Sequence, residues 1–185
     1  MMIKPFLLAG VATVGLLTAC ATETARAPEP TYESAAKSEF VSTNYGVADA
    51  LIARFASGPQ DGPLIVATVV NIDALGQSST LGRLISEQVS ARFSQRGFSM
   101  VEMKFGSNVY MRRGEGELVL TREITDVARV NNAQAVILGT YGVSGSSVYV
   151  NMKIVQPGSN HVLAAYDFVL PYNSEIRSML GRAVR

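Results

Sequence analysis

The chain contains an almost unbroken run of apolar residues from Leu64 to Ile72, in which odd and even positions are both hydrophobic. A strand with one face in water alternates apolar and polar side chains, whereas a strand covered on both faces is apolar throughout. The run therefore predicts the central strand of a sheet that is packed on both sides. The sequence has a single cysteine, so no internal disulfide can stabilise the domain, which must rely on its hydrophobic core.

Three segments carry apolar residues at helical spacing and are expected to pack against this sheet. The predicted helices span residues 45–56, 80–95 and about 122–131. Ser79 or Thr80 can cap the first turn of the second helix, and Gly97 follows its end, as glycine commonly does. A polar loop is expected at residues 73–79 and a hairpin or an excursion at residues 105–120.

Further strands are expected at residues 98–104, 135–141, 148–154 and 162–170. In the third of these, Tyr149, Asn151 and Lys153 alternate with apolar residues, which indicates one face in water. The order of elements predicts an α+β domain at residues 44–171. It has a mixed sheet of about five strands, with parallel crossovers before an antiparallel meander, and three packed helices. Residues 172–185 are expected to form a C-terminal helical tail.

The N-terminus reads as a secretory leader at residues 1–19. Lys4 supplies a positive start, an uncharged apolar run follows, and the small residues Thr18 and Ala19 precede Cys20. The apolar run is too short to span a bilayer, so we expect the leader to be removed.

The sequence from Leu17 to Cys20 resembles the bacterial lipoprotein signal. This resemblance implies that the Cys20 thiol receives a diacylglycerol and that the new amine carries a fatty acid such as palmitate. Ala21 stands where an aspartate often retains lipoproteins in the inner membrane, so the resemblance favours the outer membrane. The alternatives are a plain secreted protein with an unmodified cysteine and a coincidental match to the signal.

Residues 20–43 are rich in alanine, threonine, serine, glutamate and proline, and contain few large apolar side chains. Such a segment buries too little surface to offset the entropy lost on ordering, so we expect a disordered tether between the lipid and the domain. Removal of the leader takes away Lys4 and brings the formal net charge from +1 to zero. This balance gives no support for binding nucleic acid or for electrostatic binding to membranes.

Little in the sequence indicates catalysis, and we expect no catalytic residue, metal or cofactor. His161 is the sole histidine and lies beside turn residues, so neither a histidine-rich metal site nor a conventional Ser-His-Asp triad with a spare base is expected. Glu115 and Glu117 lie in a turn where solvated charge is the usual state. The glycines between Gly139 and Gly145 follow a strand and precede another strand, whereas a phosphate-binding loop needs a helix after its glycines.

One binding surface is a candidate at the start of the second predicted helix. It comprises Gln77, Ser78, Ser79, Thr80 and Arg83. Hydrogen-bond donors at a helix N-terminus favour an anionic or peptide-like group. The alternative is an ordinary capped helix end with a solvated arginine.

The segments Ile65–Val70, Gln77–Gln88, Gln95–Phe98, Val136–Tyr141 and Val148–Asn151 together resemble the FlgO-type domain of bacterial envelope lipoproteins. The similarity covers residues 45–171, and the segment from Gln77 to Gln88 is its most specific part. The resemblance implies an outer-membrane lipoprotein that faces the periplasm, is associated with flagellum stability and motility, and has no enzymatic activity.

Two other functions remain open alongside a flagellar or other envelope partner. One is a tethered regulatory lipoprotein that binds a peptidoglycan synthase, and the other is a subunit of a secretion complex. A secretion pore needs strands that face the membrane, whereas the polar residues Tyr149, Asn151 and Lys153 suit a strand in water better. The oligomeric state does not follow from the sequence.

Overall fold

The computed structural model describes residues 29–56, 61–102 and 122–181. The chain divides into two compact units, Met1–Ala36 and Lys37–Arg185. The described part of the first unit holds one short helix, α1 (Tyr32–Ala36), at whose start the Thr31 hydroxyl accepts a hydrogen bond from the Ser34 backbone N–H at 3.2 Å. The elements that follow α1 belong to the second unit.

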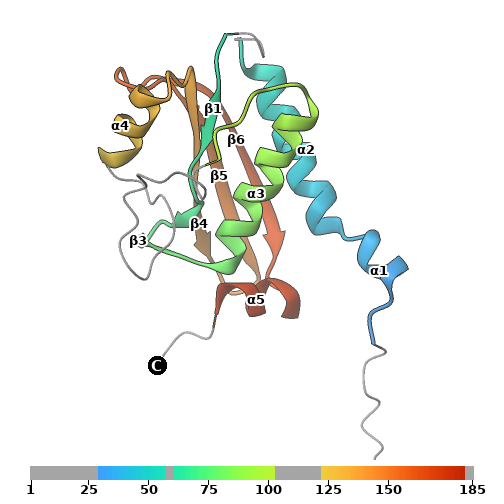
Figure 1. Cartoon of the computed structure of the whole chain (residues 1–185). Helices are drawn as coiled ribbons and strands as arrows, with labels where there is room; N and C mark the ends of the chain where they lie inside the picture. The colour runs from blue at the N-terminus through green and yellow to red at the C-terminus, as the bar shows by residue number, and fades with distance from the viewer. Residues whose placement is uncertain (1–28, 57–60, 103–121, 182–185) are drawn as a thin grey trace, which may run out of the picture. The chain divides into compact units, whose positions relative to one another are not determined.

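The second unit is built on one mixed sheet (Figure 1). Its strands are β1 (Leu64–Val66), β2 (Val70–Asn71), β3 (Ala74–Ser78), β4 (Ala135–Val143), β5 (Ser147–Val155) and β6 (Val162–Pro171). Its helices are α2 (Glu39–Arg54), α3 (Thr80–Gln95), α4 (Arg122–Val130) and α5 (Ser174–Leu180). The strand order is β3-β2-β4-β5-β6, and β1 also pairs with β4. Because β1 and β2 run parallel to β4 while the later pairs are antiparallel, the predicted α+β fold with a mixed sheet is confirmed.

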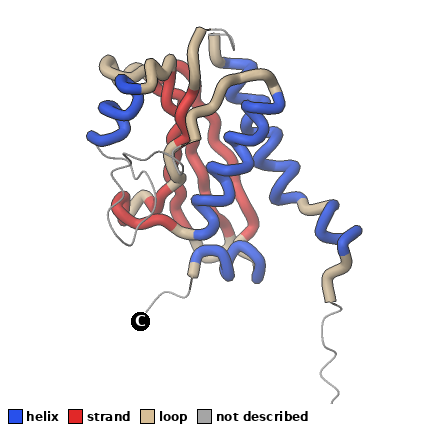
Figure 2. The backbone as a smooth tube through the Cα atoms, viewed as in Figure 1, coloured by secondary structure: helices blue, strands red, loops and turns tan. Residues whose placement is uncertain are grey.

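Helices lie on both sides of the sheet (Figure 2). On one face, Leu51 of α2, Ile85 of α3 and Ile176 of α5 join the main core beneath β4, β5 and β6. On the other face, α4 buries Ile124 in a smaller cluster over β1 and the start of β4. No described helix covers the outer face of β5 and β6, and this face carries the candidate site.

The central strand is β4, because it pairs with β1 and β2 on one side and with β5 on the other. The prediction that residues 64–72 form one central strand is therefore wrong in two respects: the run lies beside the central strand, and it breaks into β1 and β2. Its expected burial on both faces does hold, because Leu64 belongs to the main core and Ile65 to the smaller cluster.

The break between β1 and β2 is shaped by the first turns of α3. The Ser86 hydroxyl accepts a hydrogen bond from the Val69 backbone N–H at 2.9 Å and lies 3.1 Å from the Ala67 carbonyl oxygen, to which it can donate. Gly82 lies so close that a Cβ at this position would be 1.8 Å from the Val69 carbonyl oxygen. The Ala67 N–H still donates to the Ile137 carbonyl oxygen of β4 at 2.8 Å, whereas the Val69 N–H bonds to a helix side chain instead of to a neighbouring strand.

Two further predictions are corrected by the structure. Residues 73–79, expected to be a polar loop, contain β3, which pairs antiparallel with β2. The strand expected at residues 98–104 is limited to a parallel bridge between Met100 and Leu64 within the described residues. The hairpin or excursion expected at residues 105–120 lies outside the described residues and stays a prediction.

The helix expected at residues 45–56 begins earlier, at Glu39, and ends at Arg54. It extends because Phe40 and Asn44 are buried on the same side as Val47 and Leu51. The disordered tether expected at residues 20–43 is therefore wrong for its second half, which contains α1 and the start of α2. The C-terminal tail does contain a helix, α5, and the buried Ile176 docks it on the core.

Charged side chains join α2 to α3 at the surface of the main core. Arg92 binds both carboxylate oxygens of Asp49, at 3.0 and 2.7 Å, and Arg96 binds one of them at 2.8 Å. These hydrogen bonds, the one from Arg96 first and then those from Arg92, hold the pKa of the Asp49 carboxyl well below its ordinary value of 3.8. The ionised form of Asp49 is thus favoured by folding.

We expect Asp49→Asn to lower the free energy of unfolding by about 1 kcal/mol at neutral pH, a modest value because the carboxylate is one-third exposed. A lowered carboxyl pKa gives stability that is present above the unfolded-state pKa and is lost as the pH falls below it. The difference from the unmutated chain should therefore shrink below about pH 4.

Urea unfolding at a series of pH values measures this difference in the free energy of unfolding. Asp126→Asn, which removes an exposed pair with Arg129 at 3.0 Å, is the control and should change stability by only a few tenths of a kcal/mol. A pH-independent loss in Asp49→Asn would contradict the assignment.

Candidate functional site

The outer face of β4, β5 and β6 presents side chains to solvent at every second position. Along β5 the even-numbered residues, such as Val150 and Met152, are buried in the main core, while Tyr149 is exposed. β6 lies antiparallel to β5, with Val169 paired to Tyr149 and Asp167 paired to Asn151. The prediction that Tyr149, Asn151 and Lys153 lie opposite an apolar face is confirmed by this burial pattern.

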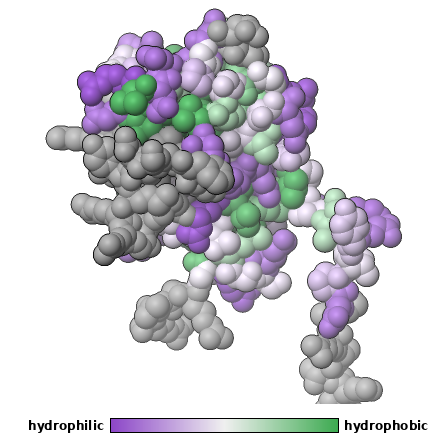
Figure 3. Space-filling model, in the orientation of Figure 1, coloured by the Kyte–Doolittle hydropathy of each residue, from purple (hydrophilic) through white to green (hydrophobic). Residues whose placement is uncertain are grey.

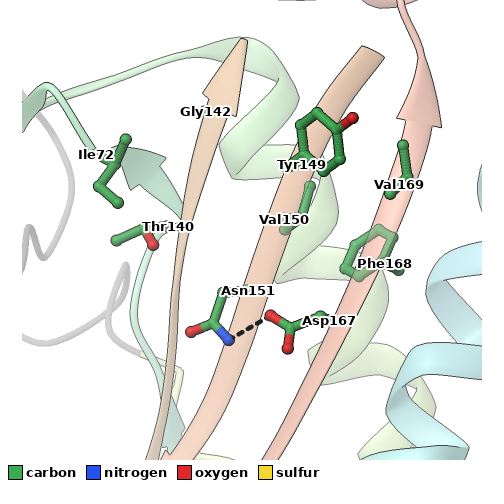
Figure 4. A pocket seen from close by; sticks show the side chains of 9 residues that line it. All are labelled: Ile72, Thr140, Gly142, Tyr149, Val150, Asn151, Asp167, Phe168 and Val169. Atoms are coloured by element: carbon green, nitrogen blue, oxygen red, sulfur yellow. Dashed lines mark hydrogen bonds between the residues drawn. The ribbon is translucent and has the colours of Figure 1, made fainter. Parts of the chain in front are cut away.

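A shallow hollow of about 370 Å³ lies on this outer face (Figure 4). Its lining comes from the end of β2 and from β4, β5 and β6: Ile72, Thr140, Gly142, Tyr149, Val150, Asn151, Asp167, Phe168 and Val169. Tyr149 and Val169 rise at one end and Ile72 at the opposite side, above the shorter side chain of Thr140. The hollow thus lies across strands that are far apart in the sequence.

Apolar side chains form the rim of the hollow. Ile72 and Tyr149 are each 58% exposed and Val169 is 52% exposed, although all three are large hydrophobic residues. On the opposite, helix-bearing side of the domain, apolar side chains occur in small patches among polar ones (Figure 3). Large apolar side chains that are exposed together around a hollow, on a sheet face that no described helix covers, are typical of a surface that another protein covers.

Polar groups and a glycine shape the floor. Asn151 donates a hydrogen bond to the Asp167 carboxylate across the two strands at 2.6 Å. Gly142 carries no side chain, and a Cβ added there would meet only the Ile72 side chain, at 3.5 Å. Any larger residue at position 142 would fill part of the space.

The hollow has the chemistry of a binding surface. Its ionisable lining consists of Tyr149 and Asp167, and the carboxylate of Asp167 is already hydrogen bonded to Asn151. In the part of the chain that the structure describes, no group of three or more His, Cys, Asp or Glu side chains is arranged to hold a metal ion. Among the same residues, none of the helices has both the length and the hydropathy needed to cross a bilayer.

The start of α3, which was the predicted binding surface, is organised around its own cap. The buried Ser79 hydroxyl accepts a hydrogen bond from the Gly82 backbone N–H at 3.1 Å, as predicted for a cap. Arg83 donates to the hydroxyls of Ser78 at 3.1 Å and Thr80 at 3.2 Å. The structure therefore brings Ser78, Thr80 and Arg83 together at the surface, with Gln77 exposed beside them on β3, while Ser79 is committed to the helix.

His161 and Gly139, which were also considered in the sequence, do not line the hollow. His161 is exposed in the turn before β6, where its carbonyl oxygen accepts a hydrogen bond from the Gln156 N–H at 2.9 Å. Gly139 lies within β4, where an added Cβ would be 2.8 Å from the Asn151 carbonyl oxygen, so close strand packing accounts for it. Cys20, Glu115 and Glu117 lie outside the described residues.

The sequence did not reveal Ile72, Gly142 and Val169 as members of one site. Val169 lies in β6, whose outward positions also include Leu163. Because inward positions such as Leu170 are apolar too, apolar residues occur on both faces of this strand. This loss of alternation was the available signal that the outer face is not fully polar.

Comparison with known proteins gives a family and a fold. The sequence model described as FlgO protein matches residues 45–175, which confirms the resemblance noted from the sequence. None of the curated proteins searched matches the chain.

Two solved structures with this fold are C-terminal domains of LpoB. The domain from Salmonella enterica has a TM-score of 0.54 and 10% identity, and the match covers 72% of this chain and 98% of that one. The domain from Escherichia coli has a TM-score of 0.54 and 11% identity, and the match again covers 72% of this chain and 98% of that one. The NMR structure of E. coli LpoB has a TM-score of 0.53 and 13% identity, and the match covers 91% of this chain and 85% of that one. At these identities the likeness is one of fold alone.

Proposed function

Because this chain belongs to the FlgO protein family, we propose that it is a non-enzymatic envelope lipoprotein that supports an envelope assembly, the flagellum, by binding one of its proteins. In this proposal a lipid on Cys20 anchors the chain to the outer membrane, and the folded domain faces the periplasm. The domain acts through its surface. The flagellar role is what the family resemblance implies.

The observation that carries the proposal is the hollow on the outer face of the sheet, which no described helix covers. Its rim residues Ile72, Tyr149 and Val169 are large and apolar, yet each is more than half exposed. Burying apolar surface contributes about 25 cal/mol per Å², so a partner that covers this rim gains binding free energy. The polar floor of Thr140, Asn151 and Asp167 then restricts which side chains fit.

The length of the segment between the lipid anchor and the domain limits how far the domain can stand from the membrane. The chain from Cys20 to the start of α2 at Glu39 spans at most about 70 Å if every residue is extended. The five helical residues of α1 shorten this limit, because a helix rises about 1.5 Å per residue. The partner is therefore expected within a few tens of ångströms of the membrane surface.

We expect Tyr149→Asp to abolish partner binding and reduce swimming in a flagellated host, because it places a charge on the apolar rim. The fold should persist, since the side chain of Tyr149 is 58% exposed. Soft-agar swimming and co-purification of the envelope partner measure the effect, and thermal unfolding checks the fold. Val130→Asp is the matched control, because Val130 is 77% exposed on α4, outside the hollow. Equal swimming of the Tyr149→Asp and unmutated strains would reject the hollow as the docking site.

The second candidate function is the regulation of a peptidoglycan synthase by the same tethered domain. An exposed hollow and a short tether suit a synthase as well as a flagellar protein. Retrieval of a synthase by crosslinking through the hollow, in cells whose motility does not depend on the chain, would select it. Ring-shaped particles in detergent would instead support the secretion-complex alternative.

A further inference from the structure

The sheet ends in a long edge strand, β6, beside the hollow. β6 is the last strand in the order β3-β2-β4-β5-β6 and spans ten residues, Val162–Pro171. An edge strand leaves a row of backbone N–H and C=O groups unpaired, which another extended chain can bind. Proteins that avoid such pairing shorten their edge strands or place lysine or proline along them. β6 has no lysine, and its one proline is its last residue.

The pairing with β5 shows which backbone groups face outward. The Tyr172 N–H donates to the Ser146 carbonyl oxygen at 3.0 Å, at the end of the register that pairs Ser147 with Pro171. Since hydrogen-bonded and non-hydrogen-bonded pairs alternate in an antiparallel ladder, the even-numbered residues of β6 bond to β5. The N–H and C=O groups of Ala165, Asp167 and Val169 therefore point away from the sheet.

These three residues also place their side chains on the outer face. Ala165 and Asp167 are exposed and Val169 is 52% exposed. Asp167 and Val169 line the hollow. A strand added at the edge would thus extend the same face and lie directly beside the hollow.

The position of α2 argues against a second copy of this chain as the occupant. α2 packs over β6, and the Arg54 guanidinium lies 5.3 Å from the centre of the Tyr166 ring. Joining two copies edge to edge at β6 would place the two strands about 4.8 Å apart. Two α2 helices above those strands would approach closer than the 8–10 Å that packed helices need. A single extended segment carries no such helix.

Charge and hydrophobicity define the segment. On the added strand, a basic residue beside Asp167 strengthens binding, because opposite charges stabilise cross-strand pairs. An apolar residue beside Val169 strengthens binding in the same way as other apolar cross-strand contacts. We propose that the β6 edge binds an extended segment of an envelope protein as an added strand, with a lysine or arginine beside Asp167 and an apolar residue beside Val169. This inference rests on the proposed function and specifies how the partner is held.

The test compares Ala165→Pro with Ala165→Val in the full mature chain. Proline removes the outward N–H of residue 165 and is tolerated at an edge whose N–H faces solvent, whereas valine keeps that N–H. The probe is a fluorescein-labelled nine-residue peptide of alternating valine and threonine in which a central lysine replaces a valine, so that the lysine and a valine two positions away share one face. Fluorescence anisotropy should show saturable sub-millimolar binding to the unmutated chain and to Ala165→Val, and at least tenfold weaker binding to Ala165→Pro. Circular dichroism confirms the fold.

Charge reversal supplies an independent arm that does not depend on proline. Asp167→Lys should bind the lysine peptide at least fivefold more weakly, and it should prefer the same peptide with a central glutamate. Absence of saturable binding to the unmutated chain, or equal binding by the proline and valine variants, overturns the inference. Binding without a change in charge preference overturns the assignment of the basic residue.

A cellular comparison separates this inference from the proposed function. If Ala165→Pro retains the envelope partner while Tyr149→Asp loses it, the edge is not used and the proposed function stands. If both variants retain it, neither the β6 edge nor the hollow is the docking site. Loss of the partner in Ala165→Pro and its retention in Ala165→Val support the added strand.

Discussion

Replacing Gly82 with alanine is expected to destabilise the domain by about 3 kcal/mol or more, at the upper end of what overpacking a core costs. The new Cβ would lie 1.8 Å from the carbonyl oxygen of Val69 and 2.9 Å from its carbonyl carbon. Both atoms belong to backbone, so no flexible side chain can move aside. To relieve the clash, α3 and the segment between β1 and β2 must separate, which also strains the hydrogen bond between Val69 and Ser86. Urea unfolding measures the loss as a lower midpoint.

Gly46 provides the matched control. It also lies in a helix, α2, but a Cβ added there meets nothing within 4 Å. Alanine at position 46 should raise the free energy of unfolding by about 0.5–1 kcal/mol, since alanine is the better helix former. If both alanine variants gain stability, the close contact of α3 with Val69 is not a feature of the folded protein.

This contact also explains a limit of sequence reasoning. The run from Leu64 to Ile72 correctly indicates a segment buried on both faces, because burial follows from hydrophobicity at each position. Its division into two strands depends on Gly82 and Ser86, which follow it in the chain and approach it only after folding. Nothing within the run itself marks the break.

Elements defined by local signals were predicted well. The predicted helix at residues 80–95 coincides with α3, because a capping serine at Ser79 and a glycine in the left-handed region at Gly97 mark its ends. By contrast, β3 is formed by mostly exposed residues and exists through its pairing with β2. The early start of α2 rests on burial of Phe40 within a polar sequence. The signal was one aromatic residue spaced seven positions before Val47.

The candidate site shows the same contrast. Its rim combines Ile72, Tyr149 and Val169, which come from three separate parts of the chain. Only the order of the strands in the sheet brings them together. Without knowledge of that order, they are three unrelated apolar residues in the sequence. The lipidation site is the opposite case, because Cys20 is indicated by the residues directly before it. It lies outside the described residues and stays a prediction.

Changing Cys20 to serine is expected to remove the chain from the outer-membrane fraction, with at least a hundredfold fall in the amount recovered there. Serine offers no thiol for the diacylglycerol, and without lipid the mature chain, whose formal net charge is zero, has no electrostatic attraction to the membrane. Buried acyl chains contribute about 0.8 kcal/mol per methylene, and stable anchoring takes two such signals. Membrane fractionation with immunoblotting measures the loss, and mass spectrometry of the unmutated chain should find fatty acids on an N-terminal Cys20.

Two comparisons make this result specific to the anchor. Ala21→Asp keeps the thiol and should remain lipidated while moving from the outer to the inner membrane, so it changes the membrane without changing the attachment. Tyr149→Asp should remain anchored but lose its partner. If anchoring and docking are separate requirements, both Cys20→Ser and Tyr149→Asp reduce swimming, although only the first leaves the outer membrane. Normal swimming by a strain whose only copy carries Cys20→Ser, or a mature chain that begins elsewhere, would show that the domain does its work without the lipid.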